Sequence, residues 1–291
     1  MSSFVRRRLL QLTAATTVIA SSSWAEVKDK PALFLIGDST VRNGREDNGA
    51  TGGQFGWGRM MKYYFDTSRL HVVNDAMGGT SSRSFQTSPD LWAKVVPMIR
   101  PGDYVMMAFG HNDSKGSLKG NGDETGPLTD KAGKVIEGVH SYGWYMREYI
   151  RQVRAKGAVP IVVSLIPRNR WTGDKVNRND TDYALWAQQA AEQEKALFIP
   201  LNGMIADRYD VIGQAKVTAD FFPPKEDVHP NWAGAAFNAA LVIDGLTRLN
   251  TPLKKYLIRS PKVPATPDIV PPAVGEPGPS GMRPSERAPV Y

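Results

Sequence analysis

The sequence predicts an α/β protein with one parallel β-sheet that helices cover on both faces. Short apolar runs recur along the chain, and each has the length of a strand buried on both faces rather than that of an ordinary helix. Stretches with helical periodicity separate these runs, an alternation that is typical of parallel sheets. Several runs are followed by Gly, Asp, Asn or Ser clusters, at the sheet edge where open α/β proteins bind ligands.

The first apolar run, residues 32–36, predicts a central strand. It stops abruptly at Gly37-Asp38-Ser39. Glycine lets the backbone turn sharply, and Asp and Ser are residues that cap and start the following element. We therefore expect Ser39 at the carboxyl end of a buried parallel strand. Taken alone, the tripeptide favours a serine that merely caps a turn, so the rest of the chain has to decide.

The other elements follow in chain order. Four further strands are expected at 70–74, 104–109, 158–165 and 196–201. Helices are expected at 54–65, near 89–99, at 142–156, at 183–195, near 203–210 and at 232–249. Gly157 closes the third of these helices in the usual way. The polar segment 114–139, which is rich in glycine and acidic residues, is predicted to be a surface loop.

The two ends of the chain have compositions unlike the middle. In residues 1–25, Arg6-Arg7-Arg8 precedes a short apolar run and small residues surround Trp24, as in a signal peptide. The arginines followed by two leucines resemble a twin-arginine export signal. Residues 260–291 are rich in proline and predict a disordered tail. We therefore expect one mature domain over residues 26–259, in the periplasm or secreted, without stable membrane insertion.

Composition excludes several kinds of site. The chain has no cysteine, so disulfides, thiol nucleophiles and thiolate metal sites are excluded. Its four histidines form no His-Glu-x-x-His pair, and we expect neither a metal nor a cofactor. The formal net charge is +7, and removing the three arginines of the predicted signal leaves +4 for the mature chain. That mild excess is not dense enough to argue for nucleic acid.

Three downstream motifs carry residues that would complement Ser39. They are Gly78-Gly79, the Gly110–Asp113 stretch with Asn112, and the Glu226–Pro230 stretch with His229. Each lies where a loop at the carboxyl edge of the sheet is expected. A serine hydroxyl is a weak nucleophile until an imidazole takes its proton, and an ester carbonyl under attack becomes an oxyanion that needs hydrogen-bond donors. Together the motifs supply a nucleophile, oxyanion donors and a base.

In order and spacing, these blocks resemble the GDSL, or SGNH, hydrolase superfamily, and within it the rhamnogalacturonan acetylesterase type. The matching stretches are FLIGDSTV, NDAMGGTSSRSF, AFGHND, VSLIPRNRW and VHPNWAGA, which span residues 33 to about 236. The resemblance implies a flavodoxin-like α/β/α sandwich with a five-stranded parallel sheet. It also implies Ser39 as nucleophile and His229 as general base. The N–H groups of Ser39 and Gly79 and the side-chain amide of Asn112 would form the oxyanion hole.

The acid partner of the histidine departs from the family pattern. The family usually has aspartate three residues before the histidine, whereas this chain has Glu226 there and Asp227 one residue closer. Glu226 holds the matching position but is one methylene longer, and Asp227 has the usual chemistry in a shifted place. Either carboxylate can orient His229, and the matching position favours Glu226.

We therefore expect a monomeric, exported serine esterase that removes acetyl groups from a plant cell-wall polysaccharide, with pectin as the first candidate, through acyl-Ser39. A lipase, lysophospholipase or thioesterase of the same superfamily is one alternative, although the polar loops do not suggest a long apolar groove. A noncatalytic carbohydrate-binding protein is another, and the intact Ser39, Asn112 and His229 argue against it. Arg168, Arg170 and Trp171 form either a solvated loop or a sugar platform with cations for carboxylates.

Overall fold

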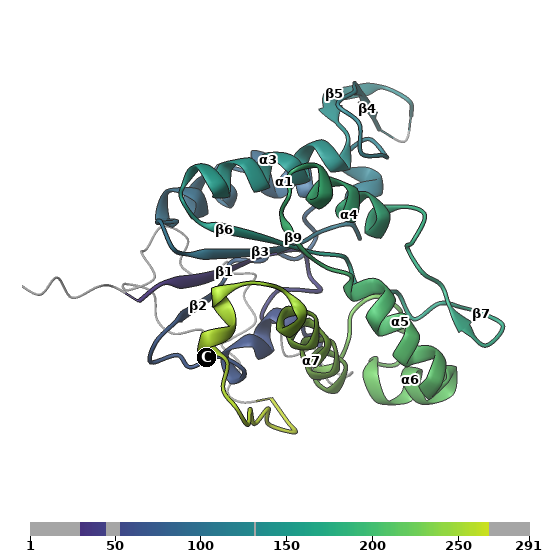
Figure 1. Ribbon diagram of the computed structural model, residues 1–291. Helices are drawn as coiled ribbons and strands as arrows, with labels where there is room; N and C mark the ends of the chain where they lie inside the picture. Colours follow the sequence, from purple (N-terminus) through teal and green to yellow (C-terminus); the bar gives the residue numbers. More distant parts are fainter. Residues whose placement is uncertain (1–29, 45–52, 131, 268–291) are drawn as a thin grey trace, which may run out of the picture.

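The computed structural model describes residues 30–44, 53–130 and 132–267. A parallel sheet of five strands runs through its middle, in the order β2-β1-β3-β6-β9 (Figure 1). The strands are β1 (Ala32–Gly37), β2 (His71–Asn74), β3 (Tyr104–Ala108), β6 (Val159–Val163) and β9 (Leu197–Ile199). The predicted fold class and all five predicted strands are therefore confirmed, with ends that differ by a few residues.

Helices cover both faces of the sheet (Figure 1). One face carries α1 (Ser82–Thr87), α2 (Trp92–Val95), η2 (Val96–Met98), α3 (Tyr142–Ala155) and α4 (Tyr183–Gln193). The other carries η1 (Trp57–Tyr63), α5 (Leu201–Ile212), α6 (Gln214–Phe221), α7 (Trp232–Arg248) and η4 (Pro252–Tyr256).

Two hydrophobic cores result from this arrangement, one on each side of the sheet. In β1, Leu33 and Leu35 belong to the core under α5 and α7, whereas Phe34 and Ile36 belong to the core under α3 and α4. Successive side chains of a strand point to opposite faces, so a strand buried on both sides must be apolar at every position. This explains why the strands are continuous apolar runs in the sequence.

The register of the sheet places the site-forming loops side by side. Strand β1 pairs with β3 in parallel, and Gly37 lies opposite Ala108 at the carboxyl ends of the two strands. The chain after Gly37 carries Ser39, and the chain after Ala108 carries Asn112. Two residues that are far apart in the sequence therefore emerge at one edge of the sheet.

Three predictions about secondary structure are corrected. The segment 54–65 forms a 3-10 helix, η1, rather than an amphipathic α-helix. The predicted surface loop 114–139 contains η3 (Asp113–Lys115) and an antiparallel hairpin, β4 (Thr125–Thr129) and β5 (Val135–His140). Helix α6 and the short pair β7 (Trp171–Thr172) and β8 (Lys175–Val176) were not expected. The hairpin and the β7–β8 pair are short or largely exposed, so their sequences have little apolar periodicity, whereas η1 is buried and differs from the prediction in helix type.

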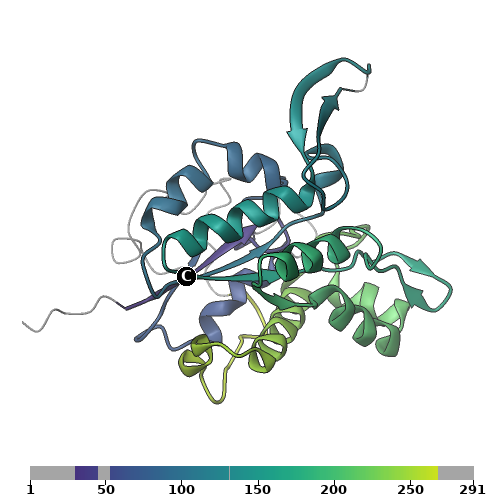
Figure 2. The ribbon, with the colours of Figure 1, turned by 45° about the horizontal axis from the view of Figure 1, so that its top comes forward.

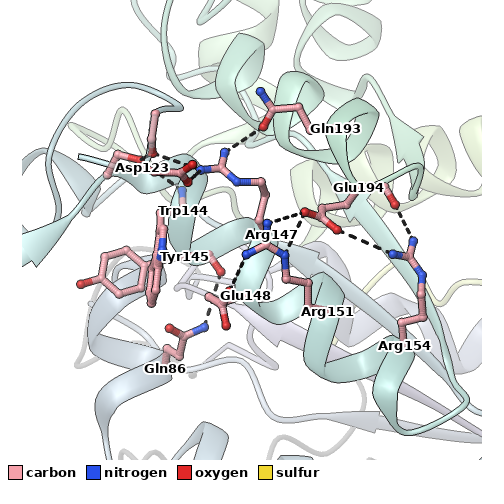
Figure 3. Close-up of polar contacts among 12 residues, drawn as sticks. Gln86, Asp123, Trp144, Tyr145, Arg147, Glu148, Arg151, Arg154, Gln193 and Glu194 are labelled. Carbon is pink, nitrogen blue, oxygen red and sulfur yellow. Dashed lines mark hydrogen bonds and ion pairs between the residues drawn. The ribbon is translucent and has the colours of Figure 1, made fainter. Parts of the chain in front are cut away.

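The β4–β5 hairpin projects away from the domain (Figure 2). The loop that precedes it is fastened to α3 by Arg147, whose side chain is buried. Its guanidinium donates to the Asn121 carbonyl at 2.7 Å, to Asp123 Oδ1 at 2.6 Å and to Gln193 Oε1 of α4 at 2.9 Å (Figure 3). Arg151 and Arg154, one and two turns further along α3, both pair with Glu194. These contacts join the loop, α3 and α4 into one unit.

The ends of the chain are described only in part. The predicted export signal, residues 1–25, lies outside the described residues. The predicted tail begins at residue 260, but the structure describes residues 260–267, and there the Pro264 carbonyl accepts a hydrogen bond from Trp232 Nε1 at 2.7 Å. Val263 also packs against the core, whereas the other residues of this stretch are exposed. Residues 268–291 lie outside the described part. None of the helices in that part is long and apolar enough to span a membrane.

Candidate active site

The turn after β1 holds Ser39 in a fixed position. Asp38 Oδ1 accepts hydrogen bonds from the backbone N–H of Thr40 at 2.9 Å and from its hydroxyl at 2.8 Å. A Cβ atom on Gly37 would lie 2.4 Å from the Ala108 carbonyl oxygen, so only glycine fits where β1 meets β3. The turn therefore lies tightly against the sheet. Ser39 is 8% exposed and sits above the carboxyl end of β1.

His229 lies next to this serine although 190 positions separate the two in the chain. Ser39 Oγ and His229 Nε2 are 2.9 Å apart, a hydrogen-bond distance. The histidine belongs to the loop that enters α7, and this loop is anchored by the N-cap of the helix, where Asn231 Oδ1 accepts from the Gly234 N–H at 2.9 Å. In this geometry the imidazole can take a proton from the hydroxyl.

The carboxylate of Glu226 lies on the other side of the imidazole. Its Oε2 is 3.1 Å from His229 Nδ1, and its Oε1 accepts the backbone N–H groups of Asp227, Val228 and His229 at 3.0, 2.8 and 3.2 Å. Burial pushes the pKa of Glu226 up, but the donors from Val228 and His229 outweigh it, so the pKa lies below its usual value. Glu226 is therefore ionised at neutral pH.

Asp227 is directed away from the imidazole. Its Oδ2 accepts from Arg170 Nε at 2.5 Å, and its carbonyl accepts the Asn169 N–H at 2.7 Å. Both contacts join the histidine loop to the loop that follows β6. Of the two carboxylates that the sequence offers as partners of His229, the structure brings Glu226 to the ring and Asp227 to an arginine.

Gly79 and Asn112 lie in loops that are bonded to each other. The Asn112 side-chain amide donates to the Thr80 carbonyl at 3.0 Å, and the Met77 N–H donates to the Gly37 carbonyl at 2.9 Å. Gly79 has φ +83°, a backbone conformation that favours glycine. Within the described residues, the N–H groups of Ser39 and Gly79 have no hydrogen-bond partner. The Asn112 side-chain amide has two hydrogens, and within the described residues only one of them is used in a hydrogen bond. These donors lie at the edge of the sheet where Ser39 emerges.

Two buried ionisable residues, His111 and Asp113, flank Asn112 in the chain. His111 has both ring nitrogens buried and unpaired within the described residues, and burial lowers its pKa so that it is neutral. Asp113 accepts the N–H of Ser82 at 3.0 Å and the Ser82 hydroxyl at 2.5 Å, which fixes α1 behind the Gly79 loop. Burial raises the pKa of Asp113 to about 7, although the Ser82 donors oppose the rise.

The shifted pKa of Asp113 predicts a pH dependence of stability. The carboxyl titrates at an ordinary value of 3.8 when unfolded and at about 7 when folded, so the folded state holds an extra proton between these values. Its contribution to the free energy of unfolding is therefore fully present below pH 3.8, declines above that pH and is lost as the pH rises through 7. We expect the difference in that free energy between the wild type and Asp113→Asn to fall from pH 4 to 8. Urea unfolding across this range measures it, and a constant difference would contradict the shift.

In the basic loop after β6, only some of the side chains predicted to contact a sugar are free to do so. Arg170 is engaged by Asp227, and the Trp171 indole N–H donates to Asn169 Oδ1 at 2.8 Å while its ring packs against the core. Arg168 is half-buried, and its one hydrogen bond within the described residues runs from Nη2 to the His111 carbonyl at 3.2 Å. The predicted platform is therefore reduced to Arg168 as a cation with free donors.

One residue of the site has no signal in the sequence. Gln54, in the segment before η1, donates from Nε2 to Glu226 Oε2 at 2.9 Å. A glutamine in a glycine-rich stretch is ordinary, and only the fold places it beside a carboxylate that is 172 positions away. In the described part of the chain, no group of three or more His, Asp, Glu or Cys side chains is placed to hold a metal ion.

The chain is similar to several known proteins. Residues 35–237 match the model of the GDSL-like Lipase/Acylhydrolase family. The chain is 31% identical over 231 residues to the uncharacterized esterase YxiM of Bacillus subtilis, an alignment that covers 77% of this chain and 54% of YxiM. It thus spans about half the length of that relative. A crystal structure of YxiM superposes with a TM-score of 0.60 at 27% identity, covering 76% of this chain and 57% of that one.

Two further relatives have names that specify a substrate. The chain is 27% identical over 230 residues to the probable rhamnogalacturonan acetylesterase YesY of Bacillus subtilis, covering 78% of this chain and 97% of YesY. It is 27% identical over 228 residues to the rhamnogalacturonan acetylesterase of Emericella nidulans, covering 74% of this chain and 86% of that enzyme.

Proposed function

Because the chain belongs to the GDSL-like Lipase/Acylhydrolase family, we propose that it is a serine esterase that removes acetyl groups from an acetylated plant polysaccharide. The observation that carries the proposal is the line of contacts from Ser39 Oγ to His229 Nε2 at 2.9 Å, and from His229 Nδ1 to Glu226 Oε2 at 3.1 Å. This is the arrangement that a serine needs to act as a nucleophile on an acyl carbonyl.

The first half of the reaction would form acetyl-Ser39. Ser39 Oγ attacks the acetyl carbonyl as its proton passes to His229 Nε2. The N–H groups of Ser39 and Gly79 and the free amide hydrogen of Asn112 donate hydrogen bonds that stabilise the negative charge developing on the carbonyl oxygen. As the intermediate collapses, the bond to the sugar oxygen breaks, and His229 returns the proton to this leaving oxygen.

The second half would release acetate. A water molecule attacks the acetyl-Ser39 carbonyl and loses a proton to His229 Nε2. The same donors stabilise the second oxyanion, and its collapse gives acetate and the free Ser39 hydroxyl. Throughout, the ionised Glu226 keeps the proton of His229 on Nδ1, so that Nε2 is the nitrogen that accepts. Each turnover consumes one ester and one water.

The polymer that we propose is rhamnogalacturonan or another acetylated pectin. Two relatives bear rhamnogalacturonan acetylesterase in their names, and Arg168 offers unpaired donors at the same edge of the sheet. A guanidinium binds a carboxylate through two parallel hydrogen bonds, and the galacturonate units of pectin carry carboxylates. Arg170 is already paired with Asp227, so Arg168 is the residue that we assign to this contact.

This assignment predicts a selective effect of Arg168→Ala. The KM for acetylated pectic oligomers should rise about fivefold, because a partly solvated charge contact is worth on the order of 1 kcal/mol. Hydrolysis of p-nitrophenyl acetate, which has no carboxylate, should stay unchanged. Acetate release is measured from acetylated pectic oligomers, acetylated xylo-oligosaccharides and p-nitrophenyl acetate, with a lysophospholipid as a fourth substrate.

Arg259→Ala is the matched control. Arg259 is exposed and follows Ile258, whose N–H donates to the Tyr64 carbonyl near the start of β2, at the opposite edge of the sheet. It should behave as the wild type on every substrate. Equal losses on all substrates in the Arg168 variant would make that arginine structural. Faster turnover of the lysophospholipid than of any acetylated glycan would overturn the polysaccharide assignment itself.

A further inference from the structure

The carboxylate of Glu226 is held differently at its two oxygens. Oε1 is fixed by three backbone N–H groups of its own loop, at 2.8 to 3.2 Å. Oε2, which faces the imidazole, has one other hydrogen-bond donor within the described residues, Gln54 Nε2 at 2.9 Å. The position of the oxygen that His229 meets therefore depends on a side chain from a different part of the fold.

The imidazole itself does not fix this oxygen. His229 Nδ1 lies 3.1 Å from Oε2, an ion-pair contact, and this contact alone leaves the direction of the carboxylate unfixed. A glutamate has one more torsion than an aspartate, so its outer oxygen has more freedom to swing about the oxygen that the backbone holds. A second, independent donor removes that freedom.

Gln54 is placed by its neighbour rather than by its own amide. The N–H of Phe55 donates to the Pro230 carbonyl at 2.9 Å, directly after His229. The Phe55 ring packs edge-on against Trp232 of α7 with centroids 5.2 Å apart. The backbone of residues 54 and 55 is thus attached to the histidine loop whatever side chain stands at position 54. Removing the amide should leave the segment where it is.

We propose that Gln54 is a positioning residue for the ester hydrolysis: its amide holds Glu226 Oε2 against His229 Nδ1 and so allows a glutamate to serve at this position. The inference rests on the proposed function, because it assigns Gln54 a role in that reaction. A purely structural hydrogen bond, one that only joins the segment before η1 to the histidine loop, is the competing explanation. The two differ in what happens to kcat and to its pH dependence.

The test uses the full chain with Gln54→Ala and Gln54→Glu. Gln54→Ala should lower kcat about tenfold to a hundredfold, the usual effect of losing a hydrogen bond to a charged group, with KM unchanged. In Gln54→Glu, two carboxylates meet at high pH and repel, whereas at lower pH a shared proton restores a hydrogen bond between them. The ratio of its kcat/KM to that of the wild type should therefore rise as the pH falls from 8 to 5.

Gln188 offers a matched control on the surface of α4. Its Nε2 donates to Glu192 Oε1 at 2.7 Å, so it is also a glutamine bonded to a glutamate, but both residues are exposed. Gln188→Ala and Gln188→Glu should keep the wild-type kcat, and their ratio to the wild type should not vary with pH. Thermal melting of all four variants checks that each is folded.

The outcomes separate this inference from the function on which it rests. Labelling of Ser39 by a fluorophosphonate probe reports the Ser39–His229 pair without any ester substrate. If the wild type neither labels nor releases acetate, the proposed function fails. If the wild type does both and Gln54→Ala labels and turns over at the wild-type rate, only the role of Gln54 is overturned. A loss in Gln54→Glu that is the same at every pH would also overturn it, in favour of the structural bond.

Discussion

Replacing Ser39 with alanine is expected to lower kcat for acetate release by at least about a thousandfold, because the proposed acyl intermediate forms on its hydroxyl. The loss should appear with p-nitrophenyl acetate as well as with acetylated pectic oligomers, since every ester must react at the same oxygen. Binding of the oligomer should persist, because the donors at Gly79 and Asn112 and the Arg168 side chain remain.

The alanine variant should also fold normally. Ser39 Oγ has one hydrogen bond within the described residues, to His229, and the turn is held by Asp38 and Thr40 instead. The melting temperature of Ser39→Ala should therefore stay close to that of the wild type. Ser68→Ala, which removes an exposed hydroxyl bonded to Asp66, is a suitable control for activity. Activity of Ser39→Ala within tenfold of the wild type would exclude the acyl-serine mechanism and leave a noncatalytic scaffold open.

The sheet could be predicted from the sequence because burial on both faces is a local property. Each central strand must be apolar at every position, so the pattern of a single segment is sufficient, as Phe34 and Leu35 on opposite faces of β1 illustrate. The β4–β5 hairpin lacks this property. Val135 and Ile136 of β5 are 58% and 62% exposed, and no core dictates where apolar residues fall in the hairpin. Its strands therefore look like the loop that surrounds them.

The residues of the candidate site also divide into those that local sequence patterns predict and those that they do not. The sequence could predict Ser39, Gly79, Asn112 and His229 as candidates because each follows a strand or precedes a helix in a short motif, and those motifs meet where parallel strands end. Gln54 could not be predicted, since its contact with Glu226 spans 172 positions and follows no local pattern. For the choice between Glu226 and Asp227, only the family position favoured Glu226, because neighbouring side chains differ mainly in the direction in which the loop turns them.

That choice can now be tested, and Glu226→Gln is expected to be far more damaging than Asp227→Asn. In Glu226→Gln, the three backbone N–H groups of the loop require an acceptor and so keep the amide oxygen at the place of Oε1. The amide nitrogen must then face His229 Nδ1, where it is a donor. The imidazole can meet it only as the tautomer that carries its proton on Nε2, and this tautomer cannot accept a proton from Ser39. We expect kcat to fall by about a thousandfold to ten-thousandfold.

Asp227→Asn should cost much less activity. The Asp227 carboxylate pairs with Arg170, and the two side chains are 39% and 57% exposed, so the ion pair contributes little in water. An asparagine at this position still accepts a hydrogen bond from the guanidinium, and kcat should stay within about fivefold of the wild type. Both variants are compared at one pH with p-nitrophenyl acetate, and their melting temperatures are recorded beside the rates. A larger loss in Asp227→Asn than in Glu226→Gln would mean that the loop turns Asp227 to the imidazole in the working enzyme, and the assignment of Glu226 would be wrong.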